Sequence, residues 1–417
     1  MNLFCYLNNI FFGLIALITI NADAHDEINI YSAHELGVSK NKLEAIDHAI
    51  KFKIENKNFP GAILLMSKNG KIFHFDSYGY QDITKNIKMS KDSLFRIFSM
   101  TKPITSVAVM ILYDRGHLKL TDPITKFFPS MKSLHLLDPE NMSRKKPLRV
   151  PTILDLLTHS SGLTYGRPII VDHKVKNEYR KHNVRTWNQT NEEFIKKISQ
   201  LPLVFEPGSA WEYGHSTDML ARIVEKVSGV RFDLFINENI FVPLQMNETG
   251  YKLESTNLNR VAEQFPEKNE ITLRDLSNQP KWFPGGHGLV SSALDYWKFC
   301  EMFLNNGSYQ ERQILRSSTV DLITNNQLND KIKIQPNIYP LLPKDFGFGL
   351  GFATRKLKSS DSWYGEKGDY FWLGYAGTNF LISPKNKFIF IFMAQQVGTA
   401  LSNRNMMFEL VKDIFID

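Results

Sequence analysis

Hydrophobic positions in the first hundred residues follow two periods, one typical of helices and one typical of strands. Apolar residues recur at helical spacing from Ser39 to about residue 55, and Ser39 is placed to cap that helix. Residues 62–66 and 72–75 are two strand-like runs. Asn69-Gly70 lies between them, and this pair tolerates the positive φ angles of a tight turn. The pattern therefore predicts a helix followed by a β-hairpin.

The middle of the chain has a mainly helical pattern. A long helix is expected to begin at or near Ser99, because Pro103 is tolerated in a first turn but not in a helix interior. Shorter helices are expected at 151–159 and 216–227. Residues 166–190 are polar and lack clear periodicity, so this segment is either a lid or binding loop or a merely solvated excursion.

Strand patterns return near the C-terminus. Residues 370–382 and 388–393 are rich in aromatic and β-branched side chains and are expected to form strands joined by a polar turn. Apolar residues between Met407 and Ile414 then predict a closing helix.

This order of elements predicts an α+β fold. One antiparallel sheet would be built from the N- and C-terminal segments and flanked by helices, with a mainly helical domain inserted between them. The sheet subdomain would comprise about residues 25–95 and 280–417, and the insertion about residues 96–279.

The first 24 residues differ from the rest of the chain. Residues 10–20 are an uninterrupted apolar run, followed by the small-x-small pattern Ala22-Asp23-Ala24. This arrangement predicts a cleaved secretory signal peptide over residues 1–24 and a periplasmic or secreted mature protein. No Lys or Arg precedes the run, and an uncleaved anchor is the alternative. The run is short for a bilayer crossing of about 20 residues, so no stable membrane span is expected after cleavage.

Composition narrows the function classes. The 417-residue chain carries a formal net charge of +7, but its basic residues are scattered and form no stripe with interleaved aromatics, so no nucleic-acid partner is expected. Of its two cysteines, only Cys300 lies outside the predicted signal, in an apolar helical context typical of a buried thiol. Neither H-E-x-x-H nor C-x-x-C occurs, so we expect no metal and no cofactor.

Candidate chemistry centres on Ser99-Met100-Thr101-Lys102. Positions three apart share one face of a helix, so the Ser99 hydroxyl and the Lys102 amine can meet. A serine needs a group that takes its proton, and a lysine can do so when burial or nearby positive charge destabilises its ammonium form. The positive end of the helix also suits the oxyanion of acyl transfer. Alone, this spacing is equally compatible with a capping serine beside a surface lysine.

Five segments occur in the order found in the penicillin-recognising serine hydrolases, and the sequence most resembles the class C β-lactamases and the esterases of their fold. The resemblance covers roughly residues 40–415. It is carried by Phe98-Ser99-Met100-Thr101-Lys102-Pro103, Leu156–Leu163, Phe205–Ser216, Gly285–Ser292 and Phe371–Thr378. It implies a β-lactamase/transpeptidase-like fold, Ser99 as nucleophile, and Lys102 and Tyr213 as the proton-handling pair.

The sequence departs from the lactamase pattern at two places. His215 stands where the tyrosine motif has Asn, and Trp372-Leu373-Gly374 stands where lactamases have Lys-Thr/Ser-Gly. The second form resembles the esterase branch. The resemblance further implies substrate binding by His215, Trp372, Gly374 and Tyr375, with the backbone N–H groups of Ser99 and Tyr375 holding the oxyanion.

The favoured activity is therefore hydrolysis of small esters through an acyl-Ser99 intermediate. A β-lactamase or D-amino-acid peptidase using the same residues is one alternative, so the substrate is a small ester or amide. A catalytically inactive protein that binds cell-wall peptides is the other alternative.

Two further features have weaker claims on function. His159-Ser160-Ser161-Gly162 superficially resembles a nucleophile elbow, but Thr158 stands where the first glycine is required, so a structural loop is expected. His287 lies between glycines, where a turn residue is favoured over a pocket residue.

Overall fold

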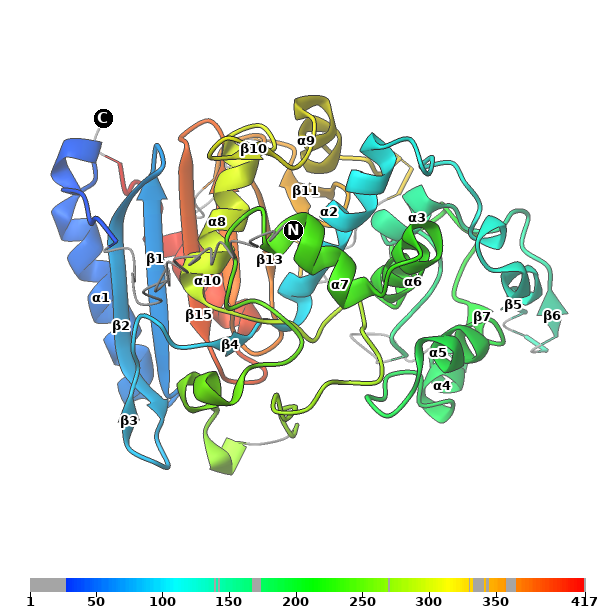
Figure 1. The fold of residues 1–417 in the computed structure, drawn as a ribbon, viewed down its shortest axis with the longest axis horizontal. Helices are drawn as coiled ribbons and strands as arrows, with labels where there is room; N and C mark the ends of the chain where they lie inside the picture. The colour runs from blue at the N-terminus through cyan, green and yellow to red at the C-terminus, as the bar shows by residue number, and fades with distance from the viewer. Residues whose placement is uncertain are drawn as a thin grey trace, which may run out of the picture.

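A computed structural model describes most of the chain (Figure 1). The described residues are 28–138, 140–141, 143–166, 174–268, 271–329, 331–332, 341–342, 345–357 and 365–415. The predicted signal segment 1–24 lies outside them. Within these ranges, every helix is too short or too polar to cross a lipid bilayer.

The centre of the fold is an eight-stranded sheet in the order β11-β12-β13-β14-β15-β1-β2-β3 (Figure 1). Each neighbouring pair is antiparallel. Its strands are β1 (Gly61–Lys68), β2 (Lys71–Asp82), β3 (Ile87–Lys88), β11 (Phe346–Phe348), β12 (Ala353–Arg355), β13 (Tyr370–Leu373), β14 (Asn379–Ser383) and β15 (Phe388–Ala394). Because β1 pairs with β15, the two ends of the chain form one sheet, and this confirms the predicted α+β class.

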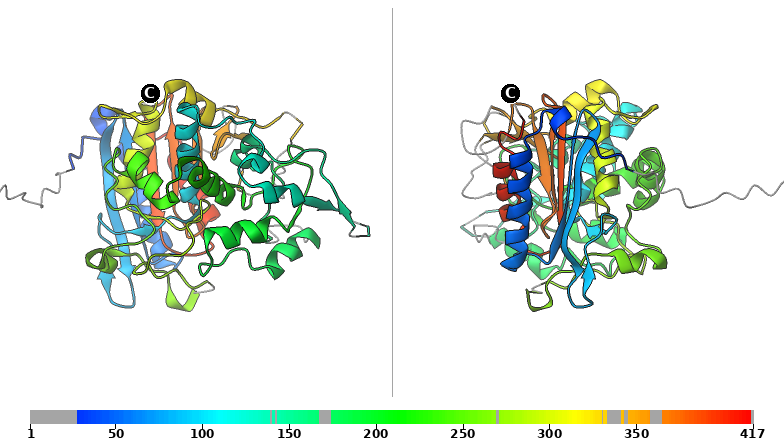
Figure 2. Two further views of the ribbon diagram at one scale, coloured as in Figure 1. Left: turned by 45° about the vertical axis from the view of Figure 1, so that its right-hand side comes forward. Right: turned by 90° about the vertical axis from the view of Figure 1, so that its left-hand side faces the viewer.

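Helices cover both faces of this sheet. Helices α1 (Lys40–Glu55) and α10 (Ala400–Leu410) lie on one face, and α8 (Ala293–Leu304) lies on the other (Figure 2). All seven residues of β15 are buried, as expected of a strand with no solvated face. Cys300, on α8, is a buried free thiol as predicted.

A mainly helical region separates β3 from β11 in the sequence (Figure 1). Its helices are α2 (Thr101–Asp114), α3 (Ile153–Leu157), α4 (Lys174–Lys181), α5 (Asn191–Ile198), α6 (Ser216–Ser228) and α7 (Phe232–Ile236), followed by α8 and α9 (Ser317–Thr324). Short strands accompany them: β4 (Phe95–Arg96) with β8 (Val290–Ser291), β9 (Ser308–Tyr309) with β10 (Arg312–Gln313), and β5 (His135–Leu137) with β6 (Arg144–Lys145) and β7 (Pro202–Leu203). The residue limits given to the insertion, 96 and 279, stay predictions.

Local signals account for the elements that the sequence predicted. The Ser39 hydroxyl accepts the Lys42 N–H at the start of α1. Asn69 and Gly70 adopt φ angles of 53° and 73° in the β1–β2 turn, as the hairpin requires. Pro103 occupies the third position of α2, where its missing N–H has no intrahelical acceptor to lose.

Two expectations need correction. Residues 370–382 do not form one strand, because the chain turns between β13 and β14 at residues 374–378, where Gly377 has a φ angle of 104°. The closing helix ends at Leu410, so Val411 and Ile414 pack into the core from the segment beyond it.

Candidate active site

Ser99 lies in the short 3₁₀ helix η2 (Phe98–Met100), immediately before α2 rather than within it. The preceding residue, Phe98, has a φ angle of 45°, a left-handed conformation that is strained for an aromatic residue. The Ile97 N–H donates to the Leu289 carbonyl over 3.0 Å and fixes the approach to this turn. Ser99 is therefore presented by a strained turn that its neighbours hold in place.

Lys102 lies directly beside Ser99. Its Nζ is 3.2 Å from the Ser99 Oγ and donates to the Gly286 carbonyl over 2.7 Å. The side chain is 1% exposed, and burial lowers the pKa of Lys102 well below its usual range, although the Asp218 carboxylate works in the opposite direction. A buried amine of this kind loses its proton more readily than a surface lysine.

Tyr213 completes the cluster around Ser99. Lys102 Nζ lies 4.5 Å from the Tyr213 ring centroid, and the Tyr213 hydroxyl shares a hydrogen bond with Ser99. The indole Nε1–H of Trp372 donates to the same hydroxyl over 3.3 Å. Burial raises the pKa of Tyr213, and the hydrogen bonds from Ser99 and Trp372 only partly oppose this effect. Tyr213 therefore holds its proton in the free protein.

His215 lies behind this cluster rather than against Ser99. Its Nδ1 is 2.8 Å from Asp218 Oδ2, and its ring packs 4.7 Å from that of Tyr165. Asp218 is fully buried, and its Oδ1 accepts the Gly286 N–H over 2.7 Å. Gly286 is also the residue whose carbonyl accepts Lys102. Asp218 thus connects His215 to the loop that holds the lysine, and among the described residues no hydrogen bond joins His215 to Ser99.

The turn after β13 lies close to the turn that carries Ser99. A Cβ built on Gly374 would come within 2.4 Å of the Ile97 carbonyl oxygen, so the two segments pack closely there. The rings of Tyr375 and Phe98 lie 6.2 Å apart at the same place. Within the described ranges, the backbone N–H groups of Ser99 and Tyr375 have no protein acceptor. One free donor belongs to Ser99 itself and the other to the turn packed against it, and donors of this kind can stabilise an oxyanion.

Trp372 has a different position from the one expected of a substrate-binding residue. Its side chain is fully buried in β13, where it packs 5.4 Å from Tyr213 and 5.4 Å from Phe348. Its contact with the site is therefore made through the hydroxyl of Tyr213.

A cavity of about 180 Å³ opens beside the turn that carries Ser99, where Phe98 lines it, although Ser99 itself is not one of the lining residues. It is lined by Arg96, Phe98, Arg185, Trp187, Ile271, Thr272, Leu273, Arg274, Leu276, Trp282, His287, Gly288, Leu289 and Tyr375. His287 lies in the bend between Gly286 and Gly288, as expected of a turn histidine, and it also lines the cavity. The polar segment 166–190 contributes Arg185 and Trp187, which supports the binding-loop interpretation; its residues 167–173 lie outside the described part.

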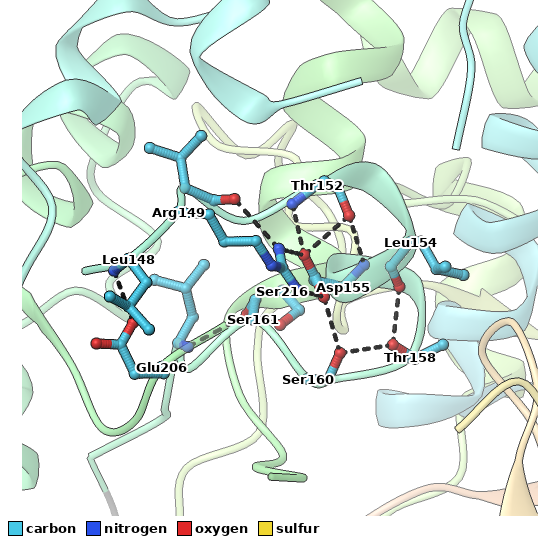
Figure 3. A network of polar contacts seen from close by, with 12 residues as sticks. Leu148, Arg149, Thr152, Leu154, Asp155, Thr158, Ser160, Ser161, Glu206 and Ser216 are labelled. Carbon is cyan, nitrogen blue, oxygen red and sulfur yellow. Dashed lines mark hydrogen bonds and ion pairs between the residues drawn. The ribbon is translucent and has the colours of Figure 1, made fainter. Parts of the chain in front are cut away.

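The loop that resembled a nucleophile elbow is tied into a structural network (Figure 3). The Ser160 hydroxyl contacts Thr158 over 2.9 Å and donates to Asp155 over 3.2 Å, and Ser161 Oγ lies 2.8 Å from Ser216 Oγ. Arg149 forms an ion pair with Asp155. Both serine hydroxyls are therefore engaged in hydrogen bonds that stabilise the loop.

Comparison with known proteins places this geometry in a family. The family profile described as Beta-lactamase matches residues 46–408. The chain belongs to the beta-lactamase family. A protein of Mycobacterium tuberculosis named only as uncharacterized is 31% identical over 347 residues, covering 80% of this chain and 85% of that protein. Esterase EstB of Burkholderia gladioli is 28% identical over 252 residues, covering 59% of this chain and 60% of the esterase.

Solved structures agree about the fold. EstCE1, described as a hydrolase with promiscuous acyltransferase activity, superposes with a TM-score of 0.76 at 19% identity, covering 90% of this chain and 98% of that structure. This beta-lactamase-family chain therefore has the fold of hydrolases whose known members include esterases and acyltransferases.

Sequence reasoning missed several residues of this beta-lactamase-family site. Asp218 follows His215 by three positions at the start of α6, a spacing that could have identified the pair. Gly286 belongs to one of the matching segments, and nothing in its local sequence indicates that its carbonyl accepts Lys102. Arg185 lies in a segment without periodicity, so no local pattern pointed to it.

Proposed function

We propose that this protein is a carboxylesterase that cleaves small esters through an acyl-Ser99 intermediate. The observation that carries the proposal is the buried Lys102 Nζ at 3.2 Å from the Ser99 hydroxyl, beside the Tyr213 hydroxyl. The depressed pKa of Lys102, caused by burial, favours the free amine as the group that accepts the serine proton. The raised pKa of Tyr213, also caused by burial, suits a proton donor and relay rather than a preformed tyrosinate.

The reaction follows from these positions. Ser99 Oγ attacks the ester carbonyl carbon while its proton passes to Lys102, and the carbonyl oxygen becomes an oxyanion held by the N–H groups of Ser99 and Tyr375. The bond to the alcohol oxygen then breaks, and that oxygen receives a proton through Tyr213. Water next attacks the acyl-enzyme and gives a proton to the same pair. The bond between the acyl carbon and Oγ breaks, Oγ regains the proton, and the carboxylic acid leaves.

Two observations favour an ester over a β-lactam. The position of the lactamase Lys-Thr/Ser-Gly is occupied by Trp372-Leu373-Gly374, and the buried Trp372 supplies no cation for a β-lactam carboxylate. Esterase EstB is also among the relatives of the chain. The inactive-binder alternative is disfavoured because Ser99, Lys102 and Tyr213 retain mutual contacts that binding alone does not require.

The test is 4-nitrophenyl butyrate hydrolysis by the wild type beside Ser99→Ala, with circular dichroism as the control for folding. We expect the variant to lose activity while remaining folded, and mass spectrometry of the wild type to find the butyryl group on Ser99. Equal activity in both proteins would remove Ser99 as nucleophile. Inactivity in both, with penicillin labelling of the wild type, would favour the lactamase or peptidase alternative, and no labelling at all would favour the binder.

We also propose that residues 1–24 direct export, so that the mature enzyme begins after Ala24 and acts in the periplasm or outside the cell. Expression of the full chain in a bacterial host, followed by mass determination of the N-terminus, tests this. A retained Met1 on membrane-associated protein would favour the anchor alternative.

A further inference from the structure

We infer that the cavity beside Ser99 binds a carboxylate carried by the substrate, so that the preferred esters are anionic small molecules such as half-esters of dicarboxylic acids. This inference rests on the proposed esterase function, because it names the substrate class of the same site.

The charged residues that line the cavity are all positive. Three arginines line it, Arg96, Arg185 and Arg274, and no Asp or Glu does. Arg96 is already engaged, since it pairs with Glu263 at 3.1 Å and donates to the carbonyls of Arg274 and Ala262. The other two arginines determine what the cavity attracts.

Arg185 is the available cation. It is exposed, its guanidinium lies 5.3 Å over the Tyr165 ring, and within the described ranges no carboxylate pairs with it. Arg274 lies 4.9 Å over the ring of Trp187 and donates to backbone carbonyls only. Burial lowers the pKa of Arg274 to about 10, so it remains charged at neutral pH. A planar guanidinium with free donors matches a carboxylate better than it matches a neutral ester group.

His287 provides a second, independent indication of a polar ligand. It is 3% exposed and lines the cavity, yet neither of its ring nitrogens has a hydrogen-bond partner on another described residue. Its ring lies 5.0 Å from that of Trp187, on the same wall as Arg274. Buried polar atoms in native proteins almost always have a partner, so a ligand oxygen is the expected occupant.

The cavity is also placed correctly for a substrate of Ser99. Phe98, which lines it, directly precedes Ser99, and the ring of Tyr375, which also lines it, lies 6.2 Å from that of Phe98. The positive charge of Arg185 reaches Lys102 and Tyr213, since it lowers the pKa of each. The aromatic walls and a volume of about 180 Å³ suit a short carbon chain, because pockets for drug-sized ligands measure roughly 300–1,000 Å³.

The experiment compares two esters of matched length, mono-4-nitrophenyl adipate and its neutral methyl ester. We expect kcat/KM to be roughly tenfold higher for the charged ester in the wild type, the scale of one charge-assisted hydrogen bond. In Arg185→Gln, the ratio of the two kcat/KM values should fall toward one. Arg312→Gln, an exposed arginine on β10 outside the cavity, serves as the matched control and should keep the wild-type ratio. A ratio near one in the wild type, or an unchanged ratio in Arg185→Gln, would overturn the inference.

A binding arm separates this inference from the proposed function. Ser99→Ala, which cannot form an acyl-enzyme, is titrated calorimetrically with 4-phenylbutanoate and with the neutral 4-phenylbutanamide. Preferential binding of the acid that is lost in the Ser99→Ala/Arg185→Gln double variant supports the carboxylate site. If the acid binds in this way but neither ester is cleaved by the wild type, only the esterase proposal fails. Cleavage of both esters at equal rates without acid binding leaves the esterase proposal intact and refutes the carboxylate site.

Discussion

Replacing Asp218 by Asn removes one negative charge from the interior of the site without changing the size of the side chain. Asp218 Oδ2 lies 2.8 Å from His215 Nδ1, and Oδ1 accepts the Gly286 N–H over 2.7 Å. Asn keeps one acceptor and replaces the other with an N–H₂ donor. Hydrogen bonds to charged groups contribute about 1.5–3 kcal/mol each, so losing one and weakening the other should lower the free energy of unfolding by roughly 2–4 kcal/mol.

The same substitution should change the pH dependence of activity in a direction that the structure fixes. The Asp218 carboxylate raises the pKa of Lys102 and so opposes the effect of burial. Without that charge, the pKa of Lys102 falls further. If the free amine of Lys102 accepts the Ser99 proton, the active form then persists to lower pH. The acidic limb of kcat/KM should therefore move to lower pH in Asp218→Asn, even though the maximal rate is reduced.

The assay is the pH profile of kcat/KM for 4-nitrophenyl butyrate from about pH 5 to about pH 9, with urea unfolding of each variant. Asp295→Asn is the matched control, because Asp295 is also buried and accepts from the Glu248 N–H, but it is not among the charges that shift the pKa of Lys102. It should destabilise the protein without shifting the profile. An acidic limb in Asp218→Asn that is unmoved, or displaced to higher pH, would refute the assignment of Lys102 as the base.

Three further predictions follow from single contacts. Tyr213→Phe should lower kcat by about 10²–10⁴, whereas Tyr165→Phe, which removes a buried hydroxyl without a described partner, should retain activity and stability; steady-state kinetics compares them. Gly374→Ala places a Cβ 2.4 Å from a backbone carbonyl oxygen and should reduce kcat by tenfold or more through loss of oxyanion stabilisation, while Gly250→Ala, with its closest neighbour at 3.4 Å, should resemble the wild type. Burial raises the pKa of Asp369 from 3.8 to about 6, so the folded state binds the proton more tightly than the unfolded state, and stability is lost as pH rises through that range. Asp369→Asn should remove at most about 3 kcal/mol of this pH dependence, measured by unfolding at about pH 4 and pH 7.

The parts of the fold that the sequence predicted are those specified by local chemistry. Asn69-Gly70 marks a turn because few residues tolerate positive φ, and Ser99 and Lys102 meet because only three residues separate them. The strand pattern of residues 370–382 was misleading because it uses local composition alone. The residues before Gly374 and after Gly377 are both strand-like, and only the pairing of β13 with β14 reveals the turn between them.

The parts that could not be predicted depend on contacts between distant segments. Asp218 acts through Gly286, which is 68 residues away, and Arg185 enters the cavity from a segment with no periodic signal. Tertiary packing determines where the Asp218 and Arg185 side chains lie, and no sequence pattern within either segment predicts it. The motifs that contain Tyr213 and Tyr375 predicted that both residues belong to the site, but they do not indicate which of their atoms face it.

Trp372 explains why a positive charge in the cavity must come from the segment that carries Arg185 and not from β13. Its indole Nε1–H donates to the Tyr213 hydroxyl, and its fully buried ring occupies β13 at the position where lactamases carry the lysine of their last motif. The same side chain therefore contacts Tyr213, the proposed proton relay, and prevents this strand from offering a cation. Because β13 carries no cation at this position, the strand alone predicts a preference for neutral esters. The cavity contradicts this expectation, because Arg185, which follows α4, contributes a cation to its lining. The ratio of kcat/KM for a charged ester and its neutral counterpart distinguishes a cavity that binds an anion from a strand that offers no cation.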